Sequence, residues 1–185
     1  MTPRPRASGC ASWRVRAPET TIPWHQPASV SAVHLIRHAK AKNRLEWEDP
    51  DHLRPLTKRG RREAAALAER LGAESLERLL SSPFVRCVQT LEPLALEVDL
   101  PIETTDLLAE GADGAEAAEL LLSLADHRPL ACCTHGDVLF DVVRTVAAAG
   151  VTLEGPPDAP VASSWVLDVD AGRFVAARFV PPPPR

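Results

Sequence analysis

The stretch VHLIRHA at residues 33–39 places an arginine and a histidine directly after an apolar run. The run from Ala32 to Ile36 has the length and composition of a buried strand. The Arg37–His38 pair therefore stands where a strand is expected to end and a loop or helix to begin. The same arrangement occurs twice more along the chain.

The stretch ACCTHGD at residues 131–137 closes the apolar run 130–134 with His135, and SSPFVR at residues 81–86 follows the short strand candidate 76–80. In open α/β sheets the ligand crevice lies beyond the carboxyl ends of the strands. We therefore expect polar groups from several separate segments to meet at one edge of a sheet.

Helical patterns alternate with these apolar runs. We expect a helix over 57–71, with Thr57 as N-cap and Gly72 at its end. A second helix is predicted after Ser82, with Pro83 as its first residue and an end before Pro93. A third is predicted over 115–126, with Leu120, Leu121 and Leu124 facing the core, and a fourth over 137–149. Residues 102–108 are predicted to be extended, and 164–169 and 173–180 to form a β-hairpin around 170–172.

This alternation predicts an α/β fold. We expect a three-layer sandwich whose central, mainly parallel sheet has helices on both faces and the C-terminal β-hairpin at its edge. Residues 1–31 are expected to be a flexible lead containing Pro and Arg, 32–180 the folded domain, and 181–185 a Pro-rich tail.

Composition narrows the class of function. The chain has 185 residues and a formal net charge of −4, so a global basic footprint for a nucleic-acid polymer is absent. No apolar stretch is long enough to span a bilayer, no signal peptide is recognised, and the cysteines fit a reducing, cytoplasmic setting. No C-x-x-C pair occurs, so a zinc or redox motif has no support, and Cys132 and Cys133 are expected to act as small buried hydrophobes. No cofactor is expected.

The residue types at the predicted strand ends suit phosphoryl chemistry. Two guanidiniums, those of Arg37 and Arg86, can clamp the non-bridging oxygens of a phosphate, and a helix starting near Ser82 would add amide donors. Ser, Cys and His are candidate nucleophiles at the rim. A neutral imidazole whose other nitrogen donates a hydrogen bond can attack phosphorus, while a protonated one can bind its oxygens. We assign His38 as nucleophile and His135 as phosphate-binding partner, although sequence alone also allows the reverse.

These stretches form an ordered set that resembles the histidine phosphatase superfamily, which has the phosphoglycerate-mutase-like fold. The set consists of RHA at 37–39, RPLT-x-x-G at 54–60, SSP-x-x-RC-x-QT at 81–90 and THG at 134–136. It is similar to short bacterial members, namely the SixA-type phosphohistidine phosphatases and the phosphatase domains attached to MutT-like Nudix hydrolases. The resemblance implies a metal-independent pocket of Arg37, His38, Arg86 and His135, with transient phosphorylation of His38. The chain carries no Nudix box, so we do not expect that second activity in it.

The proton donor for the leaving group is open between two residues. By the resemblance, Glu110 lies in the region where many members place a glutamate, and Asp137 is similar to the acid of the distant acid-phosphatase branch. Asp137 also fits an N-cap of the following helix. Ser81 and Ser82 are interpreted as cap and turn residues, and His34 as structural.

Two groups of basic residues flank this site. Lys40, Lys42, Asn43 and Arg44 follow the predicted nucleophile and are candidates for the pocket mouth. Lys58, Arg59, Arg61 and Arg62 are either a solvated face or a rim that steers an anionic substrate.

The leading functional prediction is a phosphatase that removes phosphate from a protein phosphohistidine. One alternative substrate is a small phosphate ester or a nucleoside diphosphate, and another possibility is a phosphate-binding module without turnover. A mutase is disfavoured because the loop after Glu110 is short. The expected partner is accordingly a phosphorylated protein or a small phosphorylated metabolite, with no nucleic-acid polymer and no membrane.

Overall fold

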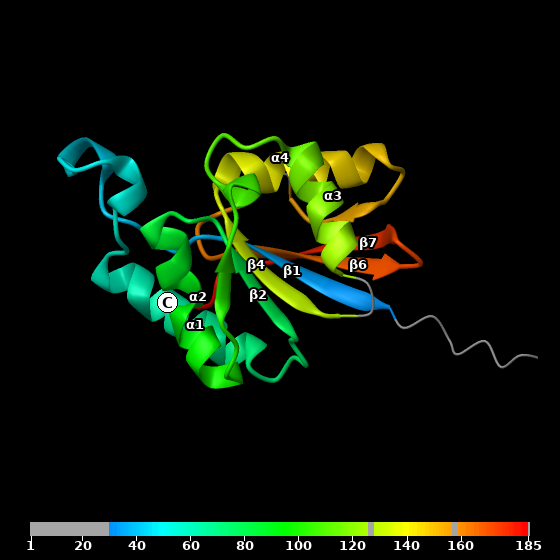
Figure 1. Ribbon diagram of the computed structural model, residues 1–185, viewed down its shortest axis with the longest axis horizontal. Helices are drawn as coiled ribbons and strands as arrows, with labels where there is room; N and C mark the ends of the chain where they lie inside the picture. The colour runs from blue at the N-terminus through cyan, green and yellow to red at the C-terminus, as the bar shows by residue number, and fades with distance from the viewer. Residues whose placement is uncertain (1–29, 126–127, 157–158, 185) are drawn as a thin grey trace, which may run out of the picture.

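Within residues 30–125, 128–156 and 159–184, which the computed structural model describes, one sheet of seven strands organises the chain (Figure 1). Its order is β3-β2-β4-β1-β6-β7-β5. The strands are β1 (Ser31–Arg37), β2 (Arg78–Ser81), β3 (Ile102–Thr104), β4 (Leu130–Thr134), β5 (Leu153–Glu154), β6 (Ser164–Asp170) and β7 (Arg173–Val180). Strands β3, β2, β4 and β1 pair in parallel, while β6 is antiparallel to both β1 and β7. The expectation of a mainly parallel sheet is confirmed.

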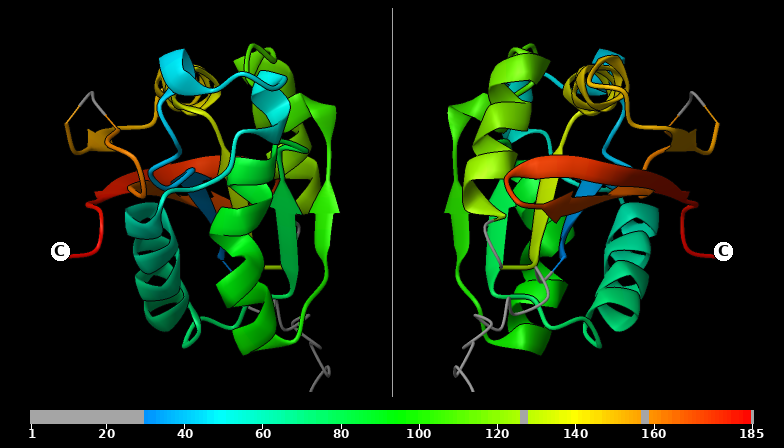
Figure 2. Two further views of the ribbon diagram at one scale, coloured as in Figure 1. Left: turned by 90° about the vertical axis from the view of Figure 1, so that its left-hand side faces the viewer. Right: turned by 90° about the vertical axis from the view of Figure 1, so that its right-hand side faces the viewer.

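Helices cover both faces of the sheet (Figure 2). Helices α1 (Lys58–Leu71) and α2 (Val85–Val98) lie on one face, and α3 (Gly114–Leu124) and α4 (Gly136–Ala148) lie on the other. Successive residues of β1 alternate between the two cores, with Leu35 packed among α3 and α4 and Ile36 among α1 and α2. The predicted three-layer sandwich is therefore observed.

Helix α1 forms as its end signals predict. The Thr57 hydroxyl accepts a hydrogen bond from the backbone N–H of Gly60 at 3.0 Å, which satisfies one of the free amides of the first turn. Leu67 and Leu71 turn to the core, and the helix gives way at Gly72. The exposed Lys58, Arg59, Arg61 and Arg62 do not line the main cavity, so they form a solvated face.

The boundaries predicted for the next helix are wrong at both ends. Helix α2 begins at Val85 rather than Pro83, because the Ser82 side chain is committed to a contact with His135. It also continues through Pro93 to Val98. Proline removes one backbone donor from a helix interior, but burial of Leu91 and Leu94 on either side outweighs that loss.

The extended run 102–108 and the core stripe of α3 also differ from their predictions. The run 102–108 splits into β3 and the short helix η3 (Asp106–Leu108), because the Thr105 hydroxyl accepts from the Leu107 N–H and turns the chain. In α3, Leu121 is fully buried while Leu120 and Leu124 are only partly so. The short helices η1 (Arg44–Glu46) and η2 (Asp51–Leu53) are not predicted by any sequence pattern.

The C-terminal hairpin is confirmed, with β6 and β7 joined at Ala171 and Gly172, whose φ values are 47° and 71°. The two-residue β5 lies beyond it at the sheet edge. The predicted lead 1–31 falls, up to residue 29, outside the described residues. Across the described ranges, no helix combines the length and apolarity needed to cross a membrane.

Candidate active site

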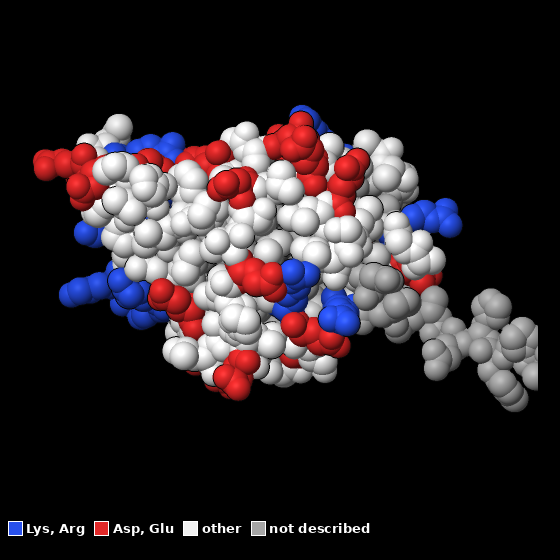
Figure 3. All heavy atoms as spheres, viewed as in Figure 1, with Lys and Arg blue, Asp and Glu red and all other residues white. Residues whose placement is uncertain are grey.

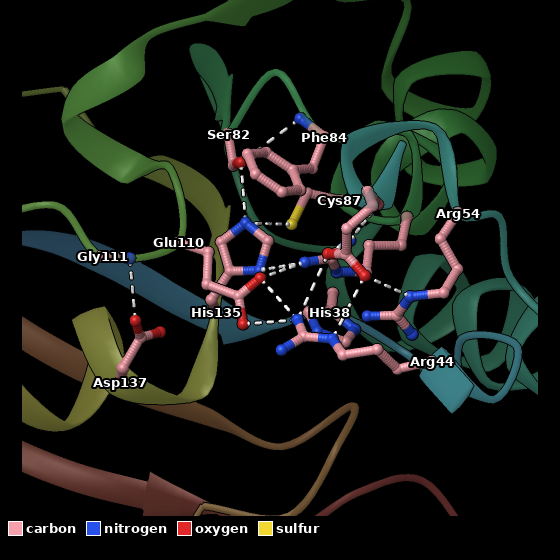
Figure 4. Close-up of polar contacts among 12 residues, drawn as sticks. His38, Arg44, Arg54, Ser82, Phe84, Cys87, Glu110, Gly111, His135 and Asp137 are labelled. Carbon is pink, nitrogen blue, oxygen red and sulfur yellow. Dashed lines mark hydrogen bonds and ion pairs between the residues drawn. The ribbon is translucent and has the colours of Figure 1, made fainter. Parts of the chain in front are cut away.

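The parallel pairing of β1 and β4 brings the two predicted histidines together. Arg37 stands opposite Thr134 in the register, so the residue after each strand emerges at the same edge. The His38 N–H donates to the Thr134 carbonyl at 3.0 Å, and the ring centroids of His38 and His135 are 5.4 Å apart (Figure 4).

Among the described residues, only one ring nitrogen of His38 has a hydrogen-bond partner. Its Nδ1 lies 2.8 Å from the Ala39 carbonyl, which can only accept, so Nδ1 carries the proton and Nε2 a lone pair. Burial lowers the pKa of His38 to about 3, and the charges of His135, Arg86 and Arg37 add to this against the opposing hydrogen bond to Ala39. The ring is therefore neutral near pH 7, as an imidazole nucleophile requires.

This lowered pKa predicts a pH dependence of stability. Between the ordinary value near 6.5 and the folded value near 3, the unfolded chain binds a proton at residue 38 that the folded chain does not. Stability therefore falls as the pH is lowered through this window, by about 2 kcal/mol at pH 5. Urea unfolding at pH 7 and pH 5 should show this loss in the native chain and much less of it in His38→Asn. The exposed His52 offers a control, His52→Asn, that should lose stability like the native chain. Equal losses in all three proteins would contradict the prediction.

His135 is held differently. The side chain is 1% exposed, its Nε2 lies 2.8 Å from the Ser82 hydroxyl, and Nη2 of Arg86 donates to its Nδ1 at 3.2 Å. Since a guanidinium only donates, Nδ1 accepts and Nε2 carries the proton. In this structure both ring nitrogens of His135 thus have side-chain partners. Ser82 orients this ring, a role that its reading as a cap and turn residue missed, although its hydroxyl also accepts from the Phe84 N–H.

The other candidate nucleophiles do not face the cavity. The Cys87 sulfur lies 3.5 Å from Nε2 of His135, and the Ser81 hydroxyl donates to the Ser82 carbonyl. Ser81, Ser82 and Cys87 are fully buried and absent from the cavity lining, whereas His38 and His135 line it. Because both nitrogens of His135 are engaged, His38 alone among these groups presents a free nucleophilic atom to the cavity.

Arg86 is a buried cation between two carboxylates. Its side chain is 0% exposed, and Nη1 lies 3.0 Å from Asp51 while Nη2 lies 2.7 Å from Glu110. The guanidinium also stacks over the Phe84 ring at 4.6 Å. A buried charge needs such partners, and their hydrogen bonds fix the plane of the guanidinium. The structure thus brings Arg86, His38 and His135 into one cluster.

Arg37 completes the cluster by lying against the start of α4. Its Nη1 donates to the Ala159 carbonyl at 2.5 Å. A Cβ at Gly136 would stand 2.9 Å from its Cζ, so only glycine lets the guanidinium lie this close to the helix N-terminus.

Gly136→Ala should therefore separate stability from activity. Alanine favours helix by about 1 kcal/mol over glycine, so we expect no loss of thermal stability. The guanidinium of Arg37 must move, and KM for phosphate substrates should rise by about tenfold. In an Arg37→Ala background the same substitution should add nothing further. An unchanged KM, or fully additive effects, would contradict this role of Gly136.

Of the two candidate acids, Glu110 belongs to the cluster. Its carboxylate accepts from Arg44 at 2.6 and 2.7 Å and from Arg86 at 2.7 Å. The Asp137 carboxylate accepts instead from the Gly111 N–H at 2.8 Å, to which it points in Figure 4. Asp137 lines the cavity but does not cap α4, so that interpretation of it is wrong.

Asp51, which no sequence pattern singles out, links three of the arginines. It accepts from Arg44 and Arg54 at 3.1 and 2.8 Å and pairs with Arg86. Partial burial raises the pKa of Asp51, but the hydrogen bond from Arg54 and the charges of Arg86, Arg54 and Arg44 outweigh this and lower it to about 2. Asp51 is therefore ionised throughout the physiological range.

Several motif residues brace the loop that follows His38. The Thr90 hydroxyl accepts from the Ala39 N–H at 3.0 Å, and the Thr57 hydroxyl donates to the Lys40 carbonyl at 2.9 Å. A Cβ at Gly60 would stand 2.1 Å from that same carbonyl, which explains the glycine of the RPLT-x-x-G stretch. Gln89 accepts from the Leu56 N–H and ties the two motifs together.

The cluster opens into a cavity of about 990 Å³. Its charged lining is mostly basic, with Arg37, Lys40, Lys42, Arg44 and Arg54 facing Glu110, Asp137 and Asp141. On the face seen in Figure 3, both signs of charge are interspersed. In the part of the chain that the structure describes, no three His, Cys, Asp or Glu side chains are grouped to hold a metal ion.

Comparison with known proteins agrees with this geometry. Residues 33–120 match the model of the histidine phosphatase superfamily (branch 1). A solved structure of the protein histidine phosphatase SixA complexed with tungstate aligns with a TM-score of 0.66 and 25% identity, covering 80% of this chain and 94% of that one. These matches place the chain in the histidine phosphatase superfamily.

The chain is also similar in sequence to a curated protein. The 8-oxo-(d)GTP phosphatase of Mycolicibacterium smegmatis is 34% identical over 163 residues, which cover 85% of this chain and 50% of that protein. The chain therefore spans about half the length of this relative. Bacillus stearothermophilus YhfR shares the fold, with a TM-score of 0.62 and 20% identity over 78% of this chain and 94% of that one.

Proposed function

We propose that this phosphatase works without a metal ion and passes the phosphoryl group through His38. The observation that carries the proposal is the single free imidazole nitrogen, Nε2 of His38, which faces a cavity lined by arginines. Arg37, Arg86 and His135 bind the non-bridging oxygens, and His135 takes up a proton at Nδ1 to do so.

The reaction then has two displacements. First, the Nε2 lone pair attacks phosphorus, an N–P bond forms, and the bond to the leaving oxygen breaks as Glu110 supplies that oxygen with a proton. Water next attacks the phosphohistidine, its proton passes to Glu110, and the N–P bond breaks to release inorganic phosphate. His38 returns to its neutral form, so protons and electron pairs balance over the cycle.

Competition for Arg86 prepares Glu110 for this role. The carboxylate shares Nη2 of Arg86 with Nδ1 of His135. Phosphate oxygens entering the cluster compete for the same donor, and they release the carboxylate to take a proton. This exchange couples substrate binding to the availability of the acid.

Glu110→Gln tests the acid through the leaving group. A poor leaving group such as an alkoxide depends on protonation, so kcat for an alkyl phosphate should fall by about 100-fold. A nucleoside monophosphate leaves easily, so kcat for a nucleoside diphosphate should fall by less than about tenfold. Steady-state rates on glycerol phosphate and GDP check this, and equal losses on both would argue for a purely structural Glu110.

For the substrate we favour a nucleoside diphosphate over a protein phosphohistidine. Arg37 lines the cavity, and the buried Arg86 pairs with Glu110 at its wall, so these two arginines suffice for one phosphate. Lys40, Lys42 and Arg44 add further positive charge to the cavity lining. A second phosphate group would use it, and the 34% identical relative named 8-oxo-(d)GTP phosphatase supports a nucleotide. The likeness to SixA keeps the protein phosphohistidine as the second candidate. The free thiols of Cys87, Cys132 and Cys133 support a reducing, cytoplasmic setting.

A substrate panel with and without EDTA decides between these candidates. We expect GDP and 8-oxo-GDP to be hydrolysed with a kcat/KM at least about tenfold above that for a phosphohistidine-bearing protein domain, and EDTA to leave all rates unchanged. A reversed order would favour the protein substrate. Strong inhibition by EDTA, relieved by added metal, would contradict the metal-independent mechanism.

A further inference from the structure

A second pocket of about 440 Å³ adjoins the phosphate cavity. Three of its lining side chains carry rings, those of Trp47, His52 and Phe84. The rest of its lining is charged, with three carboxylates and one guanidinium and no aliphatic side chain. Such a lining suits a planar ring that carries N–H donors, rather than an aliphatic chain.

The two pockets share a wall. Arg44 and Glu110 line both of them, and Arg44 donates to both oxygens of Glu110, which in turn accepts from Arg86. The carboxylates of Glu110 and Asp51, which line the ring-lined pocket, thus pair directly with Arg86 of the phosphate cluster. A molecule that replaces Glu110 as the partner of Arg44 would extend from one pocket into the other.

Aromatic side chains are scarce here, at 4% of the chain with no tyrosine. Among the described residues, Trp165, Phe174 and Phe179 belong to the core. Trp47 and Phe140 lie outside both core clusters, and each lines a cavity of the site. The Trp47 ring is only partly buried, with the Lys42 ammonium 5.0 Å from its centroid, so part of its surface is available to a ligand beside the phosphate pocket.

We infer that the ring-lined pocket binds the purine base of the leaving nucleotide, an inference that rests on the proposed function. With the reacting phosphorus at His38, the leaving phosphate meets Arg44 and the base enters between Trp47 and His52. The nearby Asp49 offers a carboxylate acceptor for the N–H edge of a guanine-type base. This assignment makes Trp47 a binding residue for the substrate base.

The test compares GDP with methyl diphosphate, which keeps both phosphates and lacks the base. Native protein should show a KM for GDP at least about tenfold below that for methyl diphosphate, and Trp47→Ala should raise only the GDP value, by about tenfold. Trp47→Phe removes the hydrogen bond from Nε1 to the Pro50 carbonyl but keeps a ring, so it should retain most of the GDP affinity. Phe140→Ala tests the alternative placement of the base, because this ring is 44% exposed and lines the main cavity from α4. Leu96→Ala is the neutral control, because it removes an apolar side chain that is 86% exposed and lines neither pocket. Neither variant should change either KM.

Each contrary result would overturn a different part of this inference. Equal KM values for GDP and methyl diphosphate in the native protein would overturn the base pocket and leave the phosphatase mechanism intact. A rise in KM for Phe140→Ala without one for Trp47→Ala would move the base to α4 and overturn the assignment. Failure of the native protein to hydrolyse either diphosphate, while it acts on phosphohistidine, would overturn the proposed substrate and the base pocket with it.

Discussion

His38→Ala will lower kcat by at least about 1,000-fold on every substrate that the native protein hydrolyses. The reason is that the free Nε2 of His38 has no substitute at the cavity surface, since both nitrogens of His135 are engaged and Ser82 and Cys87 lie buried behind it. Steady-state phosphate release measures the loss.

The control for this variant is anion binding. Arg37, Arg86 and His135 remain in His38→Ala, so tungstate should still bind with an affinity within about tenfold of the native value. Thermal unfolding should show an intact fold. Turnover within tenfold of native would reject His38 as nucleophile. If the variant lost both tungstate binding and turnover, the pocket itself would have collapsed.

Arg86→Ala is expected to lower kcat/KM by at least about 100-fold. The substitution removes a fully buried guanidinium and leaves the carboxylates of Asp51 and Glu110 facing the phosphate without compensation. It should also destabilise the fold by about 3–5 kcal/mol, because a buried ion pair then lacks one partner. Parallel activity and urea-unfolding measurements give both quantities.

Two further variants separate these effects. Arg86→Lys keeps the charge and most of the stability but loses the bidentate geometry, so it should still be at least about tenfold less active than native. Arg78→Ala removes an exposed arginine that pairs with Glu103 on the sheet, and it should leave kcat/KM unchanged. Full activity of Arg86→Lys would mean that charge alone matters and that the observed geometry does not.

The meeting of His38 and His135 at one end of the sheet could be predicted, because it depends on local sequence patterns and on the parallel pairing of neighbouring strands. Apolar runs located β1 and β4, each run ended in a histidine, and parallel neighbours end at the same edge. The cap at Thr57 and the turn at Gly172 were visible for the same reason, since each depends on residues close in sequence.

What the sequence did not predict depends on contacts between distant polar residues. Asp51 sits in a loop without periodicity, and nothing near it in the chain signals that it pairs with Arg86, 35 residues away. The tautomer of His135 likewise follows from Ser82 and Arg86, which lie far from it in sequence. The continuation of α2 through Pro93 was decided by burial of its apolar face, which outweighed the local helix-breaking tendency.

The central claim is that a phosphoryl group resides on His38 during turnover, and rapid-quench labelling tests it most directly. Native protein mixed with substrate carrying ³²P in the reacting phosphate should yield labelled protein within the first turnover. The label should be stable in base, labile in acid and located by peptide mapping at His38, and it should be absent from His38→Ala. An acid-stable label on another residue, or full turnover with no labelled protein at any time, would contradict the account.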